Sequence, residues 1–288
     1  MSFKVNTLSP VLGAEVTGLD LGQTLGANLV NDIRQSWLDA GGLLVFPEQK
    51  LSTEQHIAFS SAFGPLFGAP GQPPLQETVS RYLHPEHPEI YRVSNKVENG
   101  EPQGRDRAGT YWHSDVSFRE CPPTASILHA IEIPGTGGDT MFTNMTAAYD
   151  ALSDAMKEML APLRAQHDFA QTAATQFAER LVVEDDLHGR NRAVHPVVRT
   201  HPETGKKGLF VNPGMTTGLE GFDRQESDAI LGFLYAHATR PEFIYRHRYR
   251  QGDVVMWDNR SLMHYAVDDY GDQPRYMERT TGIGDRPV

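Results

Sequence analysis

Short strand-like runs set the strongest limit on how this chain can fold. They are rich in Val, Ile, Leu, Met and Thr and are bounded by Gly, Pro, Asp or Asn, as strands commonly are. The clearest are residues 124–133 (TASILHAIEI), 137–145 (GGDTMFTNM), 243–249 (FIYRHRY), 253–259 (DVVMWDN) and 275–283 (RYMERTTGI). Helical segments do not alternate regularly with these runs. The pattern therefore favours a β-rich α+β fold, with a closed or sandwich-like β core and helices outside, over a doubly wound parallel sheet.

Helical periodicity is confined to a few segments. It predicts helices over residues 27–42, 51–64, 146–160 and 222–238. Ser52 and Gln55 have the spacing of a capping box at the start of the second helix. Residues 65–110 are rich in Pro, Gly and polar residues and predict a mobile lid or substrate loop, whereas residues 165–208 predict an irregular insertion. We expect one domain, residues 1–288.

Composition excludes several classes of partner. The chain has 288 residues and a net charge of −11, which argues against a nucleic-acid partner, because such proteins need a basic surface. No run approaches the roughly 18 apolar residues of a membrane span, and the N-terminus lacks the pattern of a signal peptide. The single cysteine, Cys121, cannot form an internal disulfide and is expected to be a small buried apolar residue. We expect a cytoplasmic protein without a membrane partner.

The stretch YWHSDVSF, residues 111–118, carries the first candidate site. In an extended strand His113 and Asp115 would leave the same face. Two histidines and one carboxylate form the facial iron site of non-haem Fe(II) oxygenases, and His264 is the best candidate for the third ligand. A lone His-x-Asp is a weak signal, since surface loops also contain it.

Two arginines follow the third histidine. Arg275 and Arg279 lie four apart in RYMERTT, so both would lie on one face of a strand. A guanidinium binds a carboxylate or sulfonate with two parallel hydrogen bonds, which suits a small anionic ligand. Exposed salt bridges are the alternative interpretation of each arginine taken singly.

Other chemistries fit less well. The sequence has no G-x-S-x-G, H-E-x-x-H, paired C-x-x-C or phosphate-binding glycine motif. Most of the 12 histidines are expected to be ordinary. Thus His195 and His201 would pack or hydrogen-bond, and Trp257 would be a core aromatic.

The blocks WHSDVSF, GGDT, HPVVRTHPETGKKGLFVN, HATRPEF, GDVVMWDNRSLMHYAVDDY and RYMERTT, in this order, resemble those of the Fe(II)/2-oxoglutarate-dependent dioxygenases of the taurine dioxygenase (TauD/TfdA) type. The resemblance runs through nearly the whole chain. It implies a double-stranded β-helix, or distorted jelly roll, and a cytoplasmic enzyme that is often a dimer or tetramer.

The resemblance also implies roles for individual residues. His113, Asp115 and His264 would bind Fe(II). Thr140 and Arg275 would bind the distal carboxylate of 2-oxoglutarate, and Arg279 would lie near the anionic group of the substrate. These roles are carried from the family's motifs onto matching positions of this sequence. The implied reaction consumes 2-oxoglutarate and O2, releases succinate and CO2, and hydroxylates the substrate. Because the carboxylate ligand Asp115 is present, oxygenation is predicted and not halogenation.

The resemblance narrows the substrate to a small organic anion, either a sulfonate such as taurine or an aryloxy or alkyl carboxylate. Ala69, Gln72 and Gly109 stand where taurine enzymes carry other side chains, which argues against taurine itself. Residues 93–100 (VSNKVENG) resemble the aryloxyalkanoate-degrading branch, with Ser94 and Asn95 near the expected substrate pocket. Two alternatives stay open: an oxygenase that tailors a biosynthetic intermediate, and a non-catalytic jelly-roll protein that binds a small acid.

Overall fold

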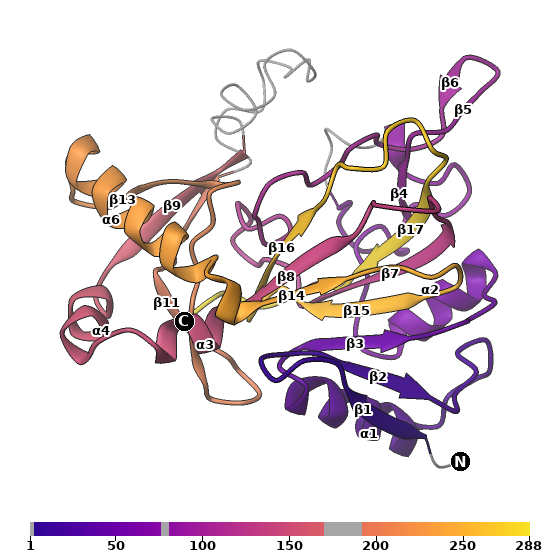
Figure 1. Ribbon diagram of the computed structural model, residues 1–288, viewed down its shortest axis with the longest axis horizontal. Helices are drawn as coiled ribbons and strands as arrows, with labels where there is room; N and C mark the ends of the chain where they lie inside the picture. Colours follow the sequence, from indigo (N-terminus) through magenta and orange to yellow (C-terminus); the bar gives the residue numbers. More distant parts are fainter. Residues whose placement is uncertain (1–2, 76–80, 170–191) are drawn as a thin grey trace.

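A computed structural model describes residues 3–75, 81–169 and 192–288. Its largest sheet has seven strands, and Figure 1 shows this sheet crossing the molecule. In spatial order the strands are β1 (Lys4–Thr7), β2 (Ala14–Thr17), β3 (Leu43–Phe46), β15 (Val254–Asp258), β7 (Ala125–Glu132), β17 (Tyr276–Thr281) and β4 (Tyr91–Ser94). Neighbouring strands pair antiparallel, except that β2 and β3 are parallel.

A second sheet faces the first. It contains β14 (Ile244–His247), β8 (Thr140–Asn144) and β16 (Leu262–Ala266), all antiparallel. The two sheets meet through buried side chains, with the Phe142 and Trp257 rings 5.8 Å apart. In β15, Val255 and Trp257 face this interior, whereas Val254 and Met256 face the opposite side. The strand is apolar throughout because both of its faces are buried.

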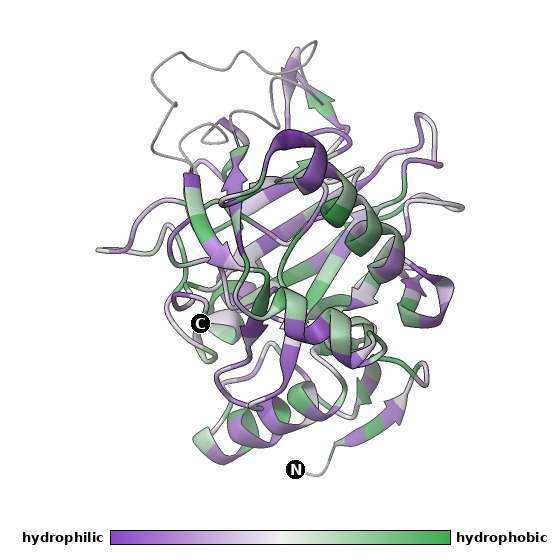
Figure 2. Cartoon of the chain, turned by 90° about the vertical axis from the view of Figure 1, so that its left-hand side faces the viewer, coloured by the Kyte–Doolittle hydropathy of each residue, from purple (hydrophilic) through white to green (hydrophobic). Residues whose placement is uncertain are grey.

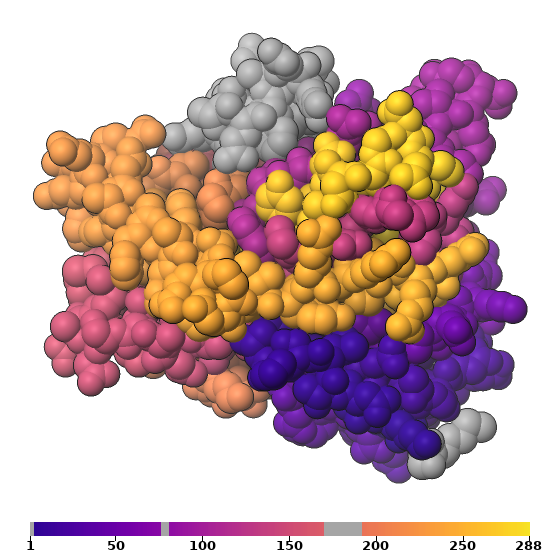
Figure 3. All heavy atoms as spheres, in the orientation of Figure 1, coloured from indigo at the N-terminus to yellow at the C-terminus, as the bar shows by residue number. Residues whose placement is uncertain are grey.

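Two helices cover the other face of the large sheet. They are α1 (Ala27–Asp39), which buries Ile33 and Trp37, and α2 (Thr53–Ser61), which buries Phe59. Figure 2 shows hydrophobic residues gathered on the inner strands and hydrophilic residues on the projecting loops. In Figure 3 the indigo N-terminal segment lies directly against the orange segment, in agreement with the ion pair of 3.4 Å between Glu15 and Arg250. The prediction of a strand-rich core with helices outside is confirmed.

A third layer lies beside these sheets (Figure 1). Its elements share one apolar cluster. They are α3 (Met145–Asp150), α4 (Asp154–Leu160), β9 (Arg164–Asp168), β10 (Arg192–Pro196), β11 (Val198–Thr200), β12 (Lys207–Leu209), β13 (Thr216–Leu219), α6 (Arg224–Ala238) and the 3-10 turn η3 (Pro241–Phe243). Strands β10, β9 and β13 form a sheet, and β11 pairs with β12. The capping box predicted for α2 is present, and Asp223 and Glu226 form another at the start of α6.

Three local predictions are wrong. The single helix expected over residues 146–160 is two, because the Ser153 hydroxyl accepts from Met156 N and starts a new helix. Residues 111–118 do not form a strand. Only His113 pairs, with His264, and the chain then turns through Val116 at φ 48°. Cys121 is exposed.

The segment predicted as irregular also needs correction. Within residues 165–208 the described parts contain most of β9 and β12 and all of β10 and β11, while residues 170–191 lie outside the described residues. Strand β9 buries Ala165 and His167 alternately, so a histidine occupies an interior position and hides the period-2 pattern. The predicted lid, residues 65–110, includes β4, β5 (Val97–Glu98) and β6 (Glu101–Pro102), and its residues 76–80 are not described. None of the described helices has the length and apolar character to cross a membrane.

Candidate metal centre and its cavity

Two histidines from distant parts of the chain meet at the inner side of β16. His113 and His264 exchange a pair of backbone hydrogen bonds of 3.0 and 2.8 Å, and their ring centroids are 4.1 Å apart. Trp257 packs against the His264 ring at 4.8 Å. Pairing of the backbones therefore fixes the two imidazoles beside each other, although only one of them belongs to a strand.

Asp115 completes the cluster. The turn after His113 brings Asp115 Oδ1 to 3.7 Å from His113 Nε2 and 3.8 Å from His264 Nε2. All three residues are buried, and their ligand atoms lie within 4.8 Å of one another. The expected meeting of His113, Asp115 and His264 in space is therefore found, with a turn in place of the predicted strand.

The protonation states suit a divalent metal. His113 Nδ1 lies 2.8 Å from Tyr111 O, which can only accept, so Nδ1 carries the proton and Nε2 keeps its lone pair. Burial lowers the pKa of His113 and lowers that of His264 further. Burial alone would raise the pKa of Asp115, but the Arg279 guanidinium, with the hydrogen bond from Ser126, outweighs it and holds the pKa below its usual range. The cluster thus offers two neutral imidazoles and one carboxylate, which fits Fe(II).

A buried guanidinium lies in the same cavity. Arg275 is 4% exposed; among the described residues its Nε has no hydrogen-bond partner, and its Nη2 reaches only Gly138 O at 3.4 Å. No carboxylate within the described residues forms an ion pair with it, so an anion from solution would satisfy this charge. Burial lowers the pKa of Arg275, as expected for a cation that lacks a counter-ion.

Thr140 lies beside this arginine in the cavity lining. Its hydroxyl oxygen accepts a hydrogen bond of 3.0 Å from the Tyr249 hydroxyl, so the proton of Thr140 is available to an acceptor in the cavity. Burial raises the pKa of Tyr249 to about 12, which keeps this phenol a donor. Arg275 and Thr140 together suit one carboxylate.

The cavity itself lies between the two facing sheets. It encloses about 800 Å³ including its open mouth. Polar groups line one part: the three cluster residues, Thr140, Arg105, Arg275 and Arg279. Apolar side chains line another: Leu75, Val93, Val116, Phe118, Phe169 and Met215. Arg279 Nη1 lies 2.7 Å from Asp115 Oδ1, so this arginine is bonded to the metal cluster.

The remaining predicted residues lie elsewhere or play other parts. The side chain of Asn95 donates to Gln273 O and accepts from Arg275 N, and Asn95 does not belong to the cavity lining. Ala69 and Gln72 are also outside the lining, whereas Gly109 is part of it. Gly109 has φ +77°, and a Cβ there would lie 2.8 Å from His113 Cε1. A larger side chain at this position would therefore press on the His113 ring.

Two buried residues near Asp115 were not found from the sequence. Ser126 Oγ donates to Asp115 Oδ2 at 2.7 Å, and Asn259 Nδ2 donates to Ser126 Oγ at 3.0 Å. Ser126 stands in an apolar strand and Asn259 in the stretch WDNR, where nothing in the residue pattern predicts a link with Asp115. Of the minor predictions, His195 and His201 form hydrogen bonds as expected, while Trp257 is both a core aromatic and part of the cavity wall.

Known proteins give a consistent picture. Residues 4–281 match the family described as taurine catabolism dioxygenase TauD, TfdA. The chain belongs to this family. It is 36% identical to the alpha-ketoglutarate-dependent 2,4-dichlorophenoxyacetate dioxygenase of Cupriavidus pinatubonensis over the whole of both chains. The TauD/TfdA chain is therefore an alpha-ketoglutarate-dependent dioxygenase that uses Fe(II), 2-oxoglutarate and O2.

Solved structures agree with this assignment. The TauD/TfdA chain is similar to a taurine dioxygenase from Burkholderia xenovorans, with TM-score 0.82 and 36% identity over 100% of this chain and 93% of that one. It is also similar to AAD-2 in complex with Mn(II) and N-oxalylglycine, with TM-score 0.79 and 31% identity over 100% and 99% of the two chains.

Proposed function

We propose that this dioxygenase hydroxylates a small organic acid with an aryl or alkyl body, of the aryloxyalkanoate class. The observation that carries the proposal is a cavity lined both by cationic groups around the three-residue cluster and by one apolar cluster that includes Val116, Phe118, Phe169 and Met215. We also assign the two facing sheets to a distorted jelly roll with the site between them.

His113, Asp115 and His264 hold Fe(II) in this proposal. Their neutral imidazoles and ionised carboxylate leave further metal positions to 2-oxoglutarate and O2. Bound together, iron, 2-oxoglutarate and O2 supply an oxidant that inserts one oxygen atom into a C–H bond, while the other oxygen leaves in succinate and CO2 is released. Arg275 and Thr140 hold the distal carboxylate of 2-oxoglutarate, with Tyr249 orienting the Thr140 hydroxyl.

The cavity wall supports the substrate class. Apolar side chains such as Phe118, Phe169 and Met215 provide contact for a ring or an alkyl chain. Among the described residues of the lining, Asp115 is the one carboxylate, and it is already bonded to Arg279. A zwitterion such as taurine would leave its ammonium group without an acidic partner from these residues. A monoanion with an apolar body fits better, with Arg279 near its charged group.

The relatives support the same direction. One acts on 2,4-dichlorophenoxyacetate, an aryl ether of a short carboxylic acid. Hydroxylation of the carbon between the ether oxygen and the carboxylate of such a compound gives a hemiacetal, which collapses to a phenol and an oxo acid. Release of a phenol would therefore report the reaction directly.

A substrate panel tests the proposal. Protein purified without oxygen is mixed with Fe(II), 2-oxoglutarate and O2 and with one aryloxyacetate, one alkyl sulfate or taurine, and succinate and phenol are measured. We expect aryloxyacetates to raise succinate above the substrate-free level and to release phenol, and His113→Ala to abolish both. Stimulation by taurine alone would overturn the substrate class, whereas the absence of succinate with every compound would count against the whole proposal.

A further inference from the structure

Asp115, Ser126 and Asn259 are connected in a ring of hydrogen bonds. Ser126 Oγ donates to Asp115 Oδ2 at 2.7 Å, and Asn259 Nδ2 donates to Ser126 Oγ at 3.0 Å. Asn259 Oδ1 in turn accepts from Asp115 N at 3.2 Å and from Trp257 Nε1 at 3.1 Å. Ser126, Asn259 and Asp115 are each no more than 3% exposed. The set therefore joins both the backbone and the side chain of Asp115 to one asparagine.

Asn259 is itself fixed by its neighbours. Its backbone N–H donates to Thr124 O at 2.9 Å, and the side chains of Asp258 and Arg260 enter a separate buried cluster. Asp258 N donates to Gly42 O at 2.9 Å, and a Cβ at Gly42 would lie 2.8 Å from the Asp258 Cβ, so the backbones approach closely here. Within WDNR, Trp257 and Asn259 therefore belong to the hydrogen-bond network of Asp115. Asp258 and Arg260, on the other side of the chain, belong to a second network.

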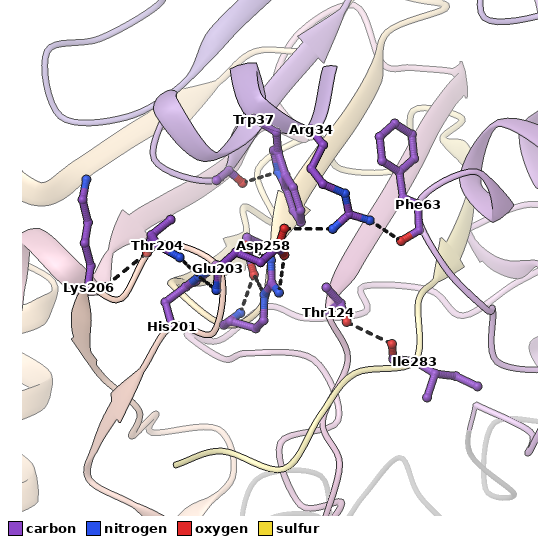
Figure 4. A network of polar contacts seen from close by, with 12 residues as sticks. Arg34, Trp37, Phe63, Thr124, His201, Glu203, Thr204, Lys206, Asp258 and Ile283 are labelled. Carbon is purple, nitrogen blue, oxygen red and sulfur yellow. Dashed lines mark hydrogen bonds and ion pairs between the residues drawn. The ribbon is translucent and has the colours of Figure 1, made fainter. Parts of the chain in front are cut away.

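Figure 4 shows the second network. Asp258 accepts hydrogen bonds from Arg260 and from His201 Nε2, while Arg260 Nη1 lies 2.7 Å from Glu203 Oε1. Glu203 Oε2 lies 3.0 Å from Arg34 Nη1, which ties the cluster to α1. The two residues that flank Asn259 are therefore anchored to α1 and to the loop between β11 and β12, and the Asn259 backbone has little freedom to move.

The two carboxylate oxygens of Asp115 consequently face different surroundings. Oδ2 accepts from the Ser126 hydroxyl, whereas Oδ1 faces the Nε2 atoms of His113 and His264 and also accepts from Arg279 Nη1 at 2.7 Å, which leaves it a second lone pair for a metal. We propose that Ser126 and Asn259 are positioning residues that hold Asp115 so that Oδ1 alone is presented to the metal. One coordination position that a bidentate carboxylate would fill is then kept for the small ligands of the reaction. This inference rests on the metal site of the proposed function.

Metal affinity tests the inference without turnover. The probe is Mn(II), and the dissociation constant is measured on the full chain from the electron paramagnetic resonance signal of free Mn(II). Loss of the Ser126 hydroxyl in Ser126→Ala should weaken Mn(II) binding about 10- to 100-fold, as is typical when a residue that orients a metal ligand is removed. Asn259→Ala should weaken it at least as much, because it releases both the serine and the Asp115 backbone.

Ser114→Ala is the matched control. Ser114 is 4% exposed, adjoins Asp115 in sequence and donates to Leu262 O at 2.9 Å, without contacting the Asp115 carboxylate. We expect its Mn(II) affinity to stay within about twofold of the wild type. The urea midpoint of each metal-free variant is measured in parallel, since a purely structural role of Ser126 would lower the midpoint and leave the affinity unchanged. If Ser126→Ala does not fold, Ser126→Cys takes its place. Because a thiol is a weaker donor than a hydroxyl, its Mn(II) affinity should be lower than that of the wild type, by less than the loss expected for Ser126→Ala.

The outcomes separate the inference from the site on which it rests. Mn(II) binding by the wild type that is lost in His113→Ala, together with weak binding by Ser126→Ala, supports the inference. Equal binding by the wild type and Ser126→Ala overturns it and leaves the metal site intact. A wild type that binds no Mn(II) would overturn the metal site and the inference together.

Discussion

Two buried carboxylates, Asp115 and Asp258, lie on either side of Asn259 and have opposite surroundings. Asp258 is 0% exposed and accepts four hydrogen bonds of 2.8–3.0 Å: three from Arg260 and one from His201 Nε2. Asp115 accepts two, from Ser126 and Arg279, and its histidines stand back at 3.7 and 3.8 Å. Asp258 therefore has hydrogen-bond donors on both of its oxygens, whereas Asp115 Oδ1 lies 3.7 and 3.8 Å from two imidazole nitrogens.

The difference separates a structural site from a reactive one. Burial alone would raise the pKa of both aspartates, but neighbouring cations outweigh it and hold both below their usual range. Both residues are therefore ionised at neutral pH. Only Asp115 has nearby nitrogen atoms that lack protons, and a metal ion would satisfy all three groups at once. Burial, charge and the presence of a histidine do not distinguish the sites, but the number of bonded donors does.

Replacing the two aspartates in turn should give opposite effects. Asp258→Ala leaves the Arg260 guanidinium buried beside the single carboxylate of Glu203, and we expect a loss of about 3–5 kcal/mol in the free energy of unfolding. Asp115→Ala should cost the metal-free protein less and should lower succinate formation by more than about 100-fold, since it removes a ligand. Urea unfolding and succinate assays on both variants test this pair. Equal losses of stability would remove the distinction.

The arginines extend the comparison. Arg260 is neutralised by two carboxylates, whereas Arg275 is buried without one among the described residues. Arg275→Gln should raise the KM for 2-oxoglutarate more than about 10-fold while changing the urea midpoint little, because the lost charge had no protein counter-ion. Arg224→Gln, on the exposed face of α6, is the control and should change neither quantity. An unchanged KM in Arg275→Gln would show that 2-oxoglutarate binds elsewhere.

Much of this architecture is predictable from the sequence because periodic burial leaves a local signal. The strands β7, β15 and β17 and the capped helices α2 and α6 follow directly from their residue patterns. The region around His167 does not, since a histidine that hydrogen-bonds to Ser117 and packs on Phe210 looks polar in sequence. Local pattern reports whether a residue is apolar, not whether a polar residue has found a buried partner.

In the candidate site, too, some residues could be predicted from the sequence and others could not. The family's motifs indicate His113, Asp115 and His264, although the expected strand is a turn and the meeting of the three depends on a bridge between distant segments. Ser126 and Asn259 escaped notice because their roles depend on contacts 11 and 144 residues away along the chain. Asn95, which was expected near the substrate, accepts a hydrogen bond from the backbone of Arg275. Roles set by long-range hydrogen bonds are not encoded in spacing.

The smallest expected effect is the loss, at acid pH, of the stability that Asp258 contributes. The folded-state pKa of Asp258 lies below its ordinary value of 3.8. Its contribution to stability is therefore complete above about pH 5 and is lost as the pH falls through 3.8 toward the folded-state value, because the unfolded chain takes up the proton first. Asp258→Asn removes this contribution. We expect the stability difference between the wild type and Asp258→Asn to narrow by about 1 kcal/mol between pH 5 and pH 3.

Urea unfolding at pH 5, 4 and 3 measures this narrowing. Asp32→Asn, at an exposed position of α1, is the control and should stay parallel to the wild type at all three pH values. A constant difference between the wild type and Asp258→Asn would mean that Asp258 does not depend on its charge for stability. The four hydrogen bonds would then act as neutral contacts, and the contrast with Asp115 would rest on geometry alone.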